Sequence, residues 1–163
     1  MKIVFLCGFM GCGKSTIGKA LGEELGLSFY DLDEEIVRGE KMSIPDIFSQ
    51  KGERHFRALE KQYIMKIGKN GGIVATGGGA MTIPETAASA KELGAVVFLD
   101  VPFEVCYKRI QGDKNRPLAA NSTKEQLLEL YLKRREIYLQ NSNFVVNADC
   151  TIQEAVERIK NIK

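Results

Sequence analysis

The sequence predicts an α/β protein in which helices cover both faces of a parallel sheet. Five short runs rich in Val, Ile, Leu and Phe are the predicted strands: Ile3–Cys7, Ser28–Leu32, Gly72–Thr76, Ala95–Leu99 and Phe144–Asn147. These runs do not alternate with polar residues, which is typical of strands that are buried on both faces. Helical patterns separate the runs, and this alternation indicates parallel strands joined by right-handed crossovers.

Apolar stripes at helical spacing predict helices between and after these strands. The stripes consist of Ile17, Ala20, Leu21 and Leu25; of Phe56, Leu59, Tyr63 and Ile67; of Leu127, Leu128, Tyr131, Leu132 and Leu139; and of Ile152, Val156 and Ile159. Gly26 directly follows the first stripe and predicts the end of that helix. The segment Gln111–Thr123 is polar and has no clear period, so we expect a mobile loop there.

The size and composition of the chain set further bounds. Its 163 residues predict a single domain over 1–163. The 23 Lys and Arg against 21 Asp and Glu give a net charge of +2, which argues against a strongly basic nucleic-acid binder. Neither a membrane-spanning run nor a signal peptide is predicted, so we expect a cytoplasmic monomer without nucleic-acid or membrane partners. The four cysteines form no C-x-x-C pair, so we expect free thiols instead of disulfides or a zinc site.

The strongest functional signal is GFMGCGKS at Gly8–Ser15, which matches the phosphate-loop pattern G-x-x-x-x-G-K-[ST]. It follows the first predicted strand and opens the first predicted helix, where backbone N–H groups and the helix N-terminus attract phosphates. Lys14 supplies a charge for the β- and γ-phosphates, and the Ser15 hydroxyl is placed to ligate Mg²⁺. The predicted nucleotide-binding residues of this loop are Gly11, Cys12, Gly13, Lys14, Ser15 and Thr16.

A phosphate loop predicts a site for a magnesium–nucleoside triphosphate and leaves the acceptor open. GTPases, transport ATPases and small-molecule kinases all share this loop. A switch GTPase would carry an N-K-x-D sequence after a strand, and the chain has none. A chance match in a glycine-rich turn is disfavoured by the predicted strand and helix on either side.

Two further polar segments directly follow predicted strands. Asp31 and Asp33 lie at the sheet edge where doubly wound folds bind ligands. If the strand continues, both carboxylates face the same way; one could hold a metal-bound water while the other accepts a proton or hydrogen bond from a hydroxyl. A solvated acidic turn that caps a helix at Glu34 explains the pair equally well. The three glycines of Thr76–Gly79 either let a ligand approach the backbone closely or form a flexible turn.

Taken together, these segments resemble shikimate kinases over nearly the whole chain. The resemblance is carried by GFMGCGKST (8–16), DLD (31–33), FRALE (56–60), TGGG (76–79), NRPL (115–118) and RREIY (134–138). It implies a three-layer P-loop NTPase fold with a five-stranded parallel sheet in the order 2-3-1-4-5. It also implies transfer of the γ-phosphoryl group of ATP to the 3-hydroxyl of shikimate, with Mg²⁺ as cofactor, on the way to chorismate and the aromatic amino acids.

The resemblance implies roles for single residues on the substrate side. Asp33 matches the carboxylate that grips two shikimate hydroxyls and orients the attacking one. Arg57 and Arg134 match the two cations that bind the shikimate carboxylate. Gly78 and Gly79 match backbone contacts to the same substrate.

On the nucleotide side, Asp31 matches a carboxylate that holds Mg²⁺ through water. Arg116 matches a lid arginine that reaches over the phosphates, and Arg109 matches a cation near the base. The implied lid spans about 111–123, and the implied substrate-binding helical part spans about 33–61.

For several of these side chains, the sequence leaves open an alternative role. Arg57 stands in an i,i+3 relation to Glu60, so a simple surface ion pair explains it, while the resemblance makes Glu60 its positioning partner. Arg135 lies nearer than Arg134 to the centre of the apolar stripe on their helix, so Arg135 is the alternative carboxylate ligand. Arg116 is also explained as a solvated loop residue.

Asp100 follows an apolar run and fits the usual second magnesium motif of P-loop proteins, whereas the resemblance gives this metal to Asp31. Two other functions also fit parts of the sequence. A kinase for another polyol acid, such as gluconate, needs the phosphate loop but not all the other segments together. A non-catalytic ATP-binding module is expected to lack Asp33 or Arg116, and both are present.

Overall fold

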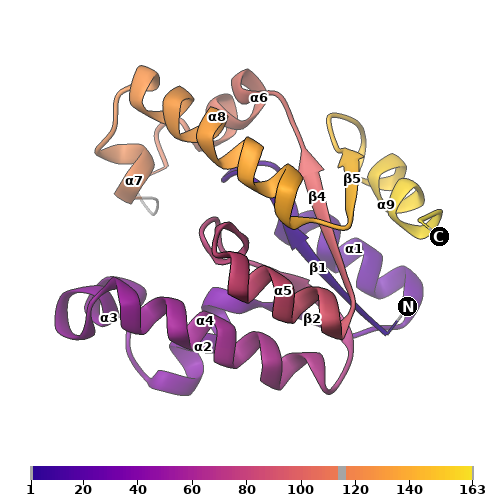
Figure 1. Cartoon of the computed structure of the whole chain (residues 1–163). Coiled ribbons are helices and arrows are strands. Elements are labelled where there is room, and N and C mark those ends of the chain that lie inside the picture. The colour runs from indigo at the N-terminus through magenta and orange to yellow at the C-terminus, as the bar shows by residue number, and fades with distance from the viewer. Residues whose placement is uncertain (1, 114–116, 163) are drawn as a thin grey trace.

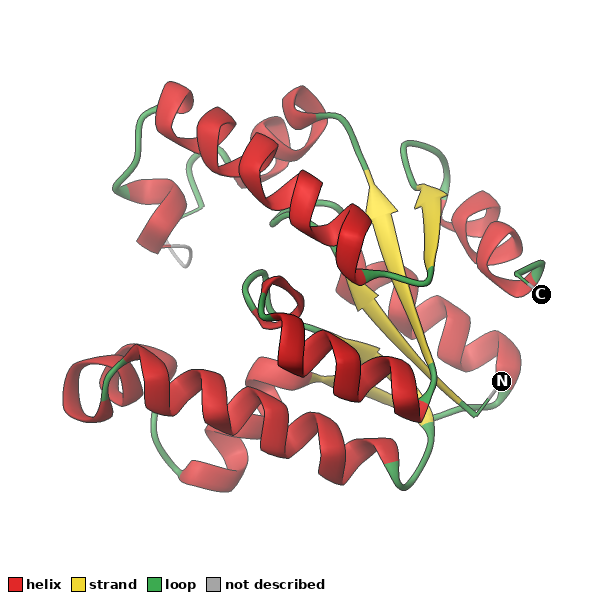
Figure 2. Cartoon of the chain, viewed as in Figure 1, coloured by secondary structure: helices red, strands yellow, loops and turns green. Residues whose placement is uncertain are grey.

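In the computed structural model, which describes residues 2–113 and 117–162, five parallel strands form one sheet. Their order is β2-β3-β1-β4-β5, so the predicted fold class and the implied strand order are confirmed. Figures 1 and 2 show the strands with helices packed on both sides of them. The strands are β1 (Ile3–Cys7), β2 (Phe29–Asp31), β3 (Gly72–Ala75), β4 (Ala95–Asp100) and β5 (Phe144–Asn147).

The central strand β1 is buried along its whole length because each of its faces packs against a different core. Successive side chains of a strand point to opposite faces. Val4 and Leu6 therefore enter one core, whereas Ile3, Phe5 and Cys7 enter the other. A strand with two apolar surroundings needs apolar residues at every position, which is why the sequence shows no alternation here.

Helices cover both faces of the sheet (Figure 1). One core is closed by α1 (Lys14–Leu25) and α9 (Ile152–Lys160), and the other by α2 (Leu32–Glu40), α3 (Ile44–Lys51), α4 (Glu53–Gly68) and α5 (Pro84–Leu93). The 3₁₀ helix η1 (Ala80–Thr82) precedes α5, and α6 (Phe103–Ile110), α7 (Pro117–Ala120) and α8 (Lys124–Asn141) connect β4 to β5.

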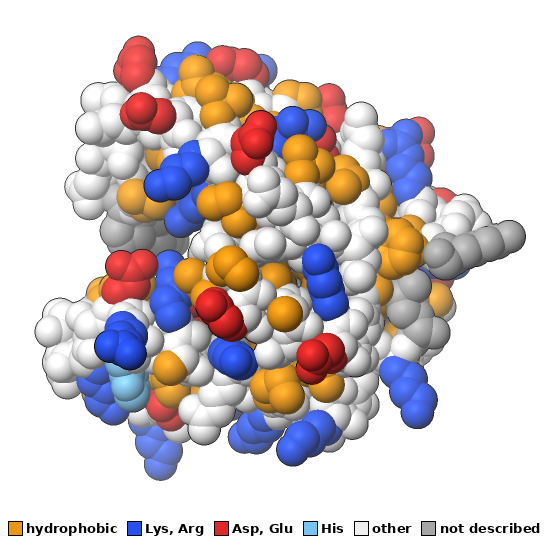
Figure 3. Space-filling view, in the orientation of Figure 1, with side chains coloured by type: hydrophobic (Ala, Val, Ile, Leu, Met, Phe, Trp, Pro, Cys, Tyr) orange, Lys and Arg blue, Asp and Glu red, His pale blue; other side chains and the backbone are white. Residues whose placement is uncertain are grey.

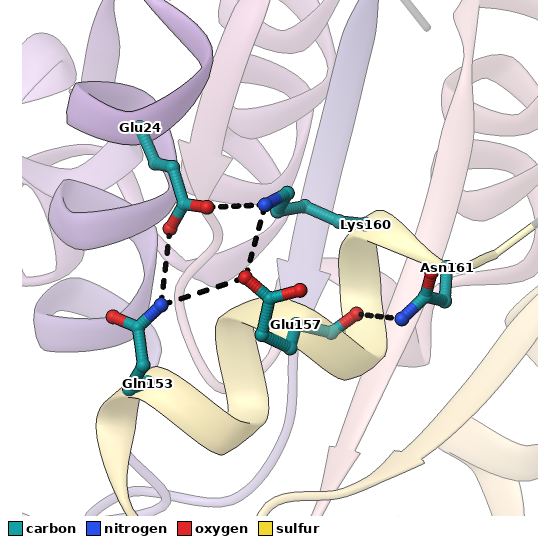
Figure 4. A network of polar contacts seen from close by, with 5 residues as sticks. All are labelled: Glu24, Gln153, Glu157, Lys160 and Asn161. Carbon is teal, nitrogen blue, oxygen red and sulfur yellow. Dashed lines mark hydrogen bonds and ion pairs between the residues drawn. The ribbon is translucent and has the colours of Figure 1, made fainter.

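The C-terminal helix α9 is fastened to α1 by a polar network as well as by apolar packing. Figure 4 shows Lys160 between the carboxylates of Glu24 and Glu157, with Gln153 on the other side of the same two groups. The Lys160 ammonium lies 3.0 Å from Glu157. It also holds the pKa of the Glu24 carboxyl below its usual range. This network connects the last helix of the chain, α9, to the first, α1.

Charge and apolar surface are mixed on the outside of the molecule. Figure 3 shows basic and acidic side chains interspersed over the face drawn, as expected from a net charge of only +2. In the described residues, no helix is both long enough and apolar enough to cross a membrane.

The helix that carries both candidate arginines, α8, departs from the predicted stripe. Leu127 and Tyr131 are buried as predicted, but Leu128, Leu132 and Leu139 are exposed by 39%, 55% and 39%. The buried side of this helix includes Tyr138 instead, whose hydroxyl makes a hydrogen bond. Apolar periodicity alone therefore placed the inner face of α8 incorrectly, because part of that face consists of aromatic residues with polar ends.

Two segments differ from the prediction for local reasons. The second strand ends at Asp31, one residue before the predicted end, and Asp33 lies in the first turn of α2, so the condition that the strand continues through Asp33 is not met. The segment predicted as a loop over 111–123 contains the short helix α7. The apolar stripes did not identify the short helices α5 and α6, whereas α2 and α3 fall within the helical part over about 33–61 that the resemblance implied.

Candidate active site

The phosphate loop joins β1 to α1, and its own groups hold it together. The Lys14 ammonium donates to the carbonyl oxygens of Gly8 at 2.7 Å and Phe9 at 3.3 Å. The Cys12 N–H donates to the Phe9 carbonyl at 3.1 Å. The Cys12 side chain is only 1% exposed and packs into the core beneath the loop. Any part that Cys12 takes in nucleotide binding therefore falls to its backbone.

The start of α1 offers unpaired donors to an anion. Its N-cap is Gly13, in the left-handed conformation with φ 99°, and within the described residues no side chain caps this helix end. The first N–H groups of a helix have no partner inside the helix, and the helix dipole makes its N-terminus partly positive. Lys14, Ser15 and Thr16 in this first turn all line a cavity of about 500 Å³. This is the arrangement by which helix N-termini bind phosphates.

Asp31 and Asp33 both reach the same cavity from the end of β2. One carboxylate oxygen of Asp31 accepts a hydrogen bond from the N–H of Glu34 at 3.2 Å and thereby caps α2. The other accepts a hydrogen bond from the Ser15 hydroxyl at 3.3 Å. The helix-cap interpretation is therefore confirmed for Asp31, and the same carboxylate also lines the cavity. Burial, with Asp31 nearby, raises the pKa of the Asp33 carboxyl, and the charges of Lys14 and Arg57 partly oppose this.

The glycines after β3 let three charged side chains from different helices approach one loop. A Cβ at Gly77 would lie 3.0 Å from Asp33 Oδ1, and one at Gly78 would lie 2.9 Å from Arg134 Nη1. A Cβ at Gly79 would lie 2.6 Å from Arg57 Cζ. Any side chain at these positions would displace one of the charged groups.

The same loop is fixed through its carbonyl groups. The Gly77 carbonyl accepts from the Ala80 N–H, the Gly78 carbonyl from the buried Tyr138 hydroxyl, and the Gly79 carbonyl from the Thr82 side chain. The buried Thr76 side chain ties the start of the loop to the Leu6 carbonyl at 2.9 Å. These hydrogen bonds favour a glycine loop of defined conformation over the flexible-turn alternative.

Arg57 is held on α4 by a buried carboxylate. Its guanidinium lies 2.5 Å from Glu60 and 3.5 Å from Glu53. The Glu60 side chain is only 2% exposed, whereas that of Glu53 is 68% exposed. Burial raises the pKa of the Glu60 carboxyl to about 7, although the neighbouring Arg57 charge lowers it. The i,i+3 pair is therefore not a solvated surface pair, and it fixes the Arg57 guanidinium beside Gly79.

The structure separates the two candidate arginines of α8. Arg134 faces Gly78, and its charge also acts on the buried Glu60. Arg135 instead donates two hydrogen bonds to the carboxylate of Asp100, at 3.0 and 2.8 Å. Asp100 is thus engaged by Arg135, and Arg134 is the arginine that lies beside the glycine loop.

Of the remaining predicted residues, those that the structure describes lie in or next to the lining of the same cavity. Gly11, Gly13, Gly78 and Arg109 are among its lining residues, and the Arg109 guanidinium donates to the Gly11 carbonyl at 2.9 Å. Gly79 is adjacent through the glycine loop. Arg116 lies outside the described residues. Sequence reasoning missed Tyr138 as the residue that fixes Gly78; only its place in the RREIY segment pointed to it.

Comparisons with known proteins identify the family and match the fold. The family model of shikimate kinase matches residues 10–162. The shikimate kinase of Persephonella marina is 46% identical over 141 residues, which cover 86% of this chain and 85% of the relative. The chain belongs to the shikimate kinase family. Like the family, it phosphorylates shikimate using ATP.

Solved shikimate kinases have the same architecture. The crystal structure from Aquifex aeolicus has a TM-score of 0.84 and 37% identity, covering 96% of this chain and 93% of its own. The enzyme from Acinetobacter baumannii in complex with shikimate has a TM-score of 0.88 and 35% identity, covering 98% and 91%. A gluconokinase from Sinorhizobium meliloti, at 18% identity and a TM-score of 0.60, shares the fold alone. The likeness to gluconokinase therefore says nothing about the substrate.

Replacing Glu60 by Gln should flatten the pH dependence of the free energy of unfolding. The Glu60 carboxyl holds its proton to about pH 7 in the folded state, against an ordinary pKa of 4.5. Between these values the folded protein binds the extra proton, so stability falls as the pH rises, by about 3 kcal/mol in all. Urea unfolding from pH 4 to 8 should show a smaller decrease for E60Q than for the unsubstituted protein.

Glu53→Gln is the matched control for this experiment. Glu53 also faces Arg57, but it is exposed, so its replacement should leave the pH slope unchanged. Equal slopes for E60Q and the unsubstituted protein would contradict the buried-acid account of Glu60.

Proposed function

We propose that the chain binds ATP in the Gly8–Ser15 loop and shikimate against the glycine loop, and transfers the γ-phosphoryl group to the 3-hydroxyl of shikimate. The observation that carries this proposal is the convergence of Asp33, Arg57 and Arg134 on residues 77–79, of which Gly77 and Gly78 line the same cavity as Lys14. These groups provide two cations for one organic anion and a carboxylate for a hydroxyl. The phosphate loop provides the donor side.

The shikimate carboxylate pairs with Arg57 and Arg134. A guanidinium binds a carboxylate through two parallel N–H donors, which fixes orientation as well as charge. The two arginines come from different helices, α4 and α8, and both contact the glycine loop. Buried Glu60 supports this assignment because it fixes one of the two guanidiniums before the substrate arrives. Less side-chain freedom is then lost on binding.

Asp33 binds the hydroxyl that attacks ATP. Its pKa is raised by burial and by Asp31, which increases its tendency to accept a proton. The carboxylate contacts Gly77 beside Arg57 and Arg134, so a substrate held by both arginines presents its hydroxyls to Asp33. Phosphoryl transfer needs positioning and charge stabilisation more than covalent help, and these side chains supply both.

The residues of the site suit a magnesium ion. Mg²⁺ prefers oxygen donors and is bound through one or two protein groups together with phosphates and water. The Ser15 hydroxyl and the Asp31 carboxylate meet at 3.3 Å on the wall of the cavity and provide such donors. We assign Ser15 as the direct ligand and Asp31 as the ligand through water. When bound, the ion neutralises charge on the β- and γ-phosphates.

The donor side is completed by Lys14, by the N-terminus of α1 and by two arginines. On ATP binding, the Lys14 ammonium leaves the loop carbonyls to which it donates and pairs with the β- and γ-phosphates. Arg109, which lines the cavity, is assigned to the region of the base. Arg116, outside the described residues, is proposed to reach over the phosphates from a lid over about 111–123. Lid closure excludes water and limits hydrolysis of ATP. The division into a helical part over about 33–61 and a lid stays a prediction, as do the monomeric state and the cytoplasmic location.

A coupled assay of ADP release with ATP and a panel of hydroxy acids tests this proposal. Shikimate should be phosphorylated and gluconate should not. Arg57→Met should lower kcat/KM for shikimate by about 100-fold, because one partner of a desolvated charge pair is lost. Arg54→Met removes an exposed cation from the same helix and should leave kcat/KM unchanged. Turnover of gluconate in place of shikimate would refute the proposed substrate, and an unaffected R57M enzyme would refute the proposed site.

The magnesium assignment predicts different effects for two aspartates. Asp31→Asn should raise the Mg²⁺ concentration for half-maximal activity about tenfold, because an amide is a weaker partner for metal-bound water. Asn retains the helix-capping ability of Asp, so α2 should stay intact. Asp100→Asn should leave the Mg²⁺ requirement unchanged, since Arg135 already occupies that carboxylate. A raised requirement in D100N alone would show that Asp100 is the metal ligand.

A further inference from the structure

Three polar contacts fasten one side of α8 to the loops at the carboxyl ends of β4 and β3. The Tyr131 hydroxyl donates to the Val101 carbonyl at 2.6 Å, and the Arg135 guanidinium binds Asp100. The Tyr138 hydroxyl donates to the carbonyl of Gly78. Positions 131, 135 and 138 follow the i, i+4, i+7 spacing of one helix face. This side of α8 is therefore fixed to the sheet by polar groups as well as by packing.

The two arginines project to opposite sides of the line through Tyr131 and Tyr138. Consecutive residues of an α-helix are rotated by about 100°. Measured around the helix from Tyr131, Arg135 lies about 40° to one side and Arg134 about 60° to the other. One side faces Asp100 on β4, and the other faces Gly78 on the glycine loop. A rotation of α8 that moves Arg135 away from Asp100 must also move Arg134 relative to Gly78.

Both the tyrosines and the Asp100 contact constrain this rotation. Tyr131 and Tyr138 are 8% and 1% exposed, pack against Phe9 and Phe98, and each make one hydrogen bond. The Arg135 guanidinium uses Nε and Nη2 on the two oxygens of one carboxylate, which fixes a planar geometry. Asp100 itself ends β4, which pairs with β1 and β5. The ion pair between Arg135 and Asp100 thus connects α8 to a strand that is hydrogen-bonded on both sides.

We propose that Asp100 and Arg135 form a positioning pair that fixes the rotation of α8 and thereby aims Arg134 at the substrate carboxylate. This inference rests on the proposed role of Arg134. It gives Asp100 a task in substrate binding, in place of the metal-binding task suggested by its position at a strand end. It also explains why two adjacent arginines are present: one reaches the site, and the other directs it.

Steady-state kinetics of R135M and D100N test the pair. Each variant should raise the KM for shikimate about tenfold, because small displacements of a positioned group are costly to binding. The KM for ATP should not change. Lys133→Met, which removes an exposed cation of α8, is the matched control and should leave both constants unchanged. Equal increases in both KM values, or an unchanged KM for shikimate, would overturn the proposal.

Combined variants separate a positioning role from direct binding. If Arg135 acts through Arg134, adding R135M to the R134M enzyme should not raise the KM for shikimate further. The D100N/R135M double variant should match either single variant, because the pair is broken in all three. A large loss in R135M with a normal D100N enzyme would instead make Arg135 the substrate ligand.

A structure of R135M keeps this inference separate from the proposed function. The Arg134 guanidinium should then lie away from Gly78, whatever the substrate of the enzyme. An Arg134 that stays beside Gly78 in R135M would refute the positioning role. Unchanged kinetics in R134M, with Arg134 displaced in the R135M structure, would refute only the proposed role of Arg134 in shikimate binding.

Discussion

The architecture of this site depends on how closely charged side chains can approach the backbone at residues 77–79. Asp33, Arg57 and Arg134 come from three different helices, and each contacts one of three consecutive glycines. A side chain on any of these glycines would occupy the space of a charged group. The glycine loop in turn is fixed by hydrogen bonds to its carbonyls, so flexible residues form a rigid surface.

This arrangement solves an electrostatic problem. Two guanidiniums beside one loop repel each other unless anions compensate them. The buried Glu60 supplies one such anion next to Arg57 once it is ionised, above a pKa of about 7, and in the proposed complex the substrate carboxylate supplies the other. The elevated pKa of Glu60 reflects the cost of keeping this compensating charge away from water. In the proposed complex, the negative charge of the substrate carboxylate is therefore added next to two guanidiniums that are already in place.

Sequence patterns predicted the sheet and the phosphate loop because both depend on local composition. Buried parallel strands need apolar residues throughout, and a phosphate loop needs glycines between a strand and a helix. The inner face of α8 was not predictable in the same way. Leu128 and Leu132 fit the apolar stripe and are exposed, while Tyr138 is buried through a long-range contact with Gly78. Likewise, the choice between Arg134 and Arg135 depends on Asp100, which is 35 residues away in the sequence.

The dependence of the site on the bare backbone of the glycine loop is tested most directly by calorimetric titration of the Gly79→Ala enzyme with shikimate and, separately, with ATP. Gly79 has φ −102°, which alanine adopts freely, so the substitution acts through its methyl group against Arg57. The dissociation constant for shikimate should rise by about tenfold or more, because the methyl group displaces Arg57, while that for ATP should be unchanged. Unaltered shikimate affinity in this variant would contradict this dependence.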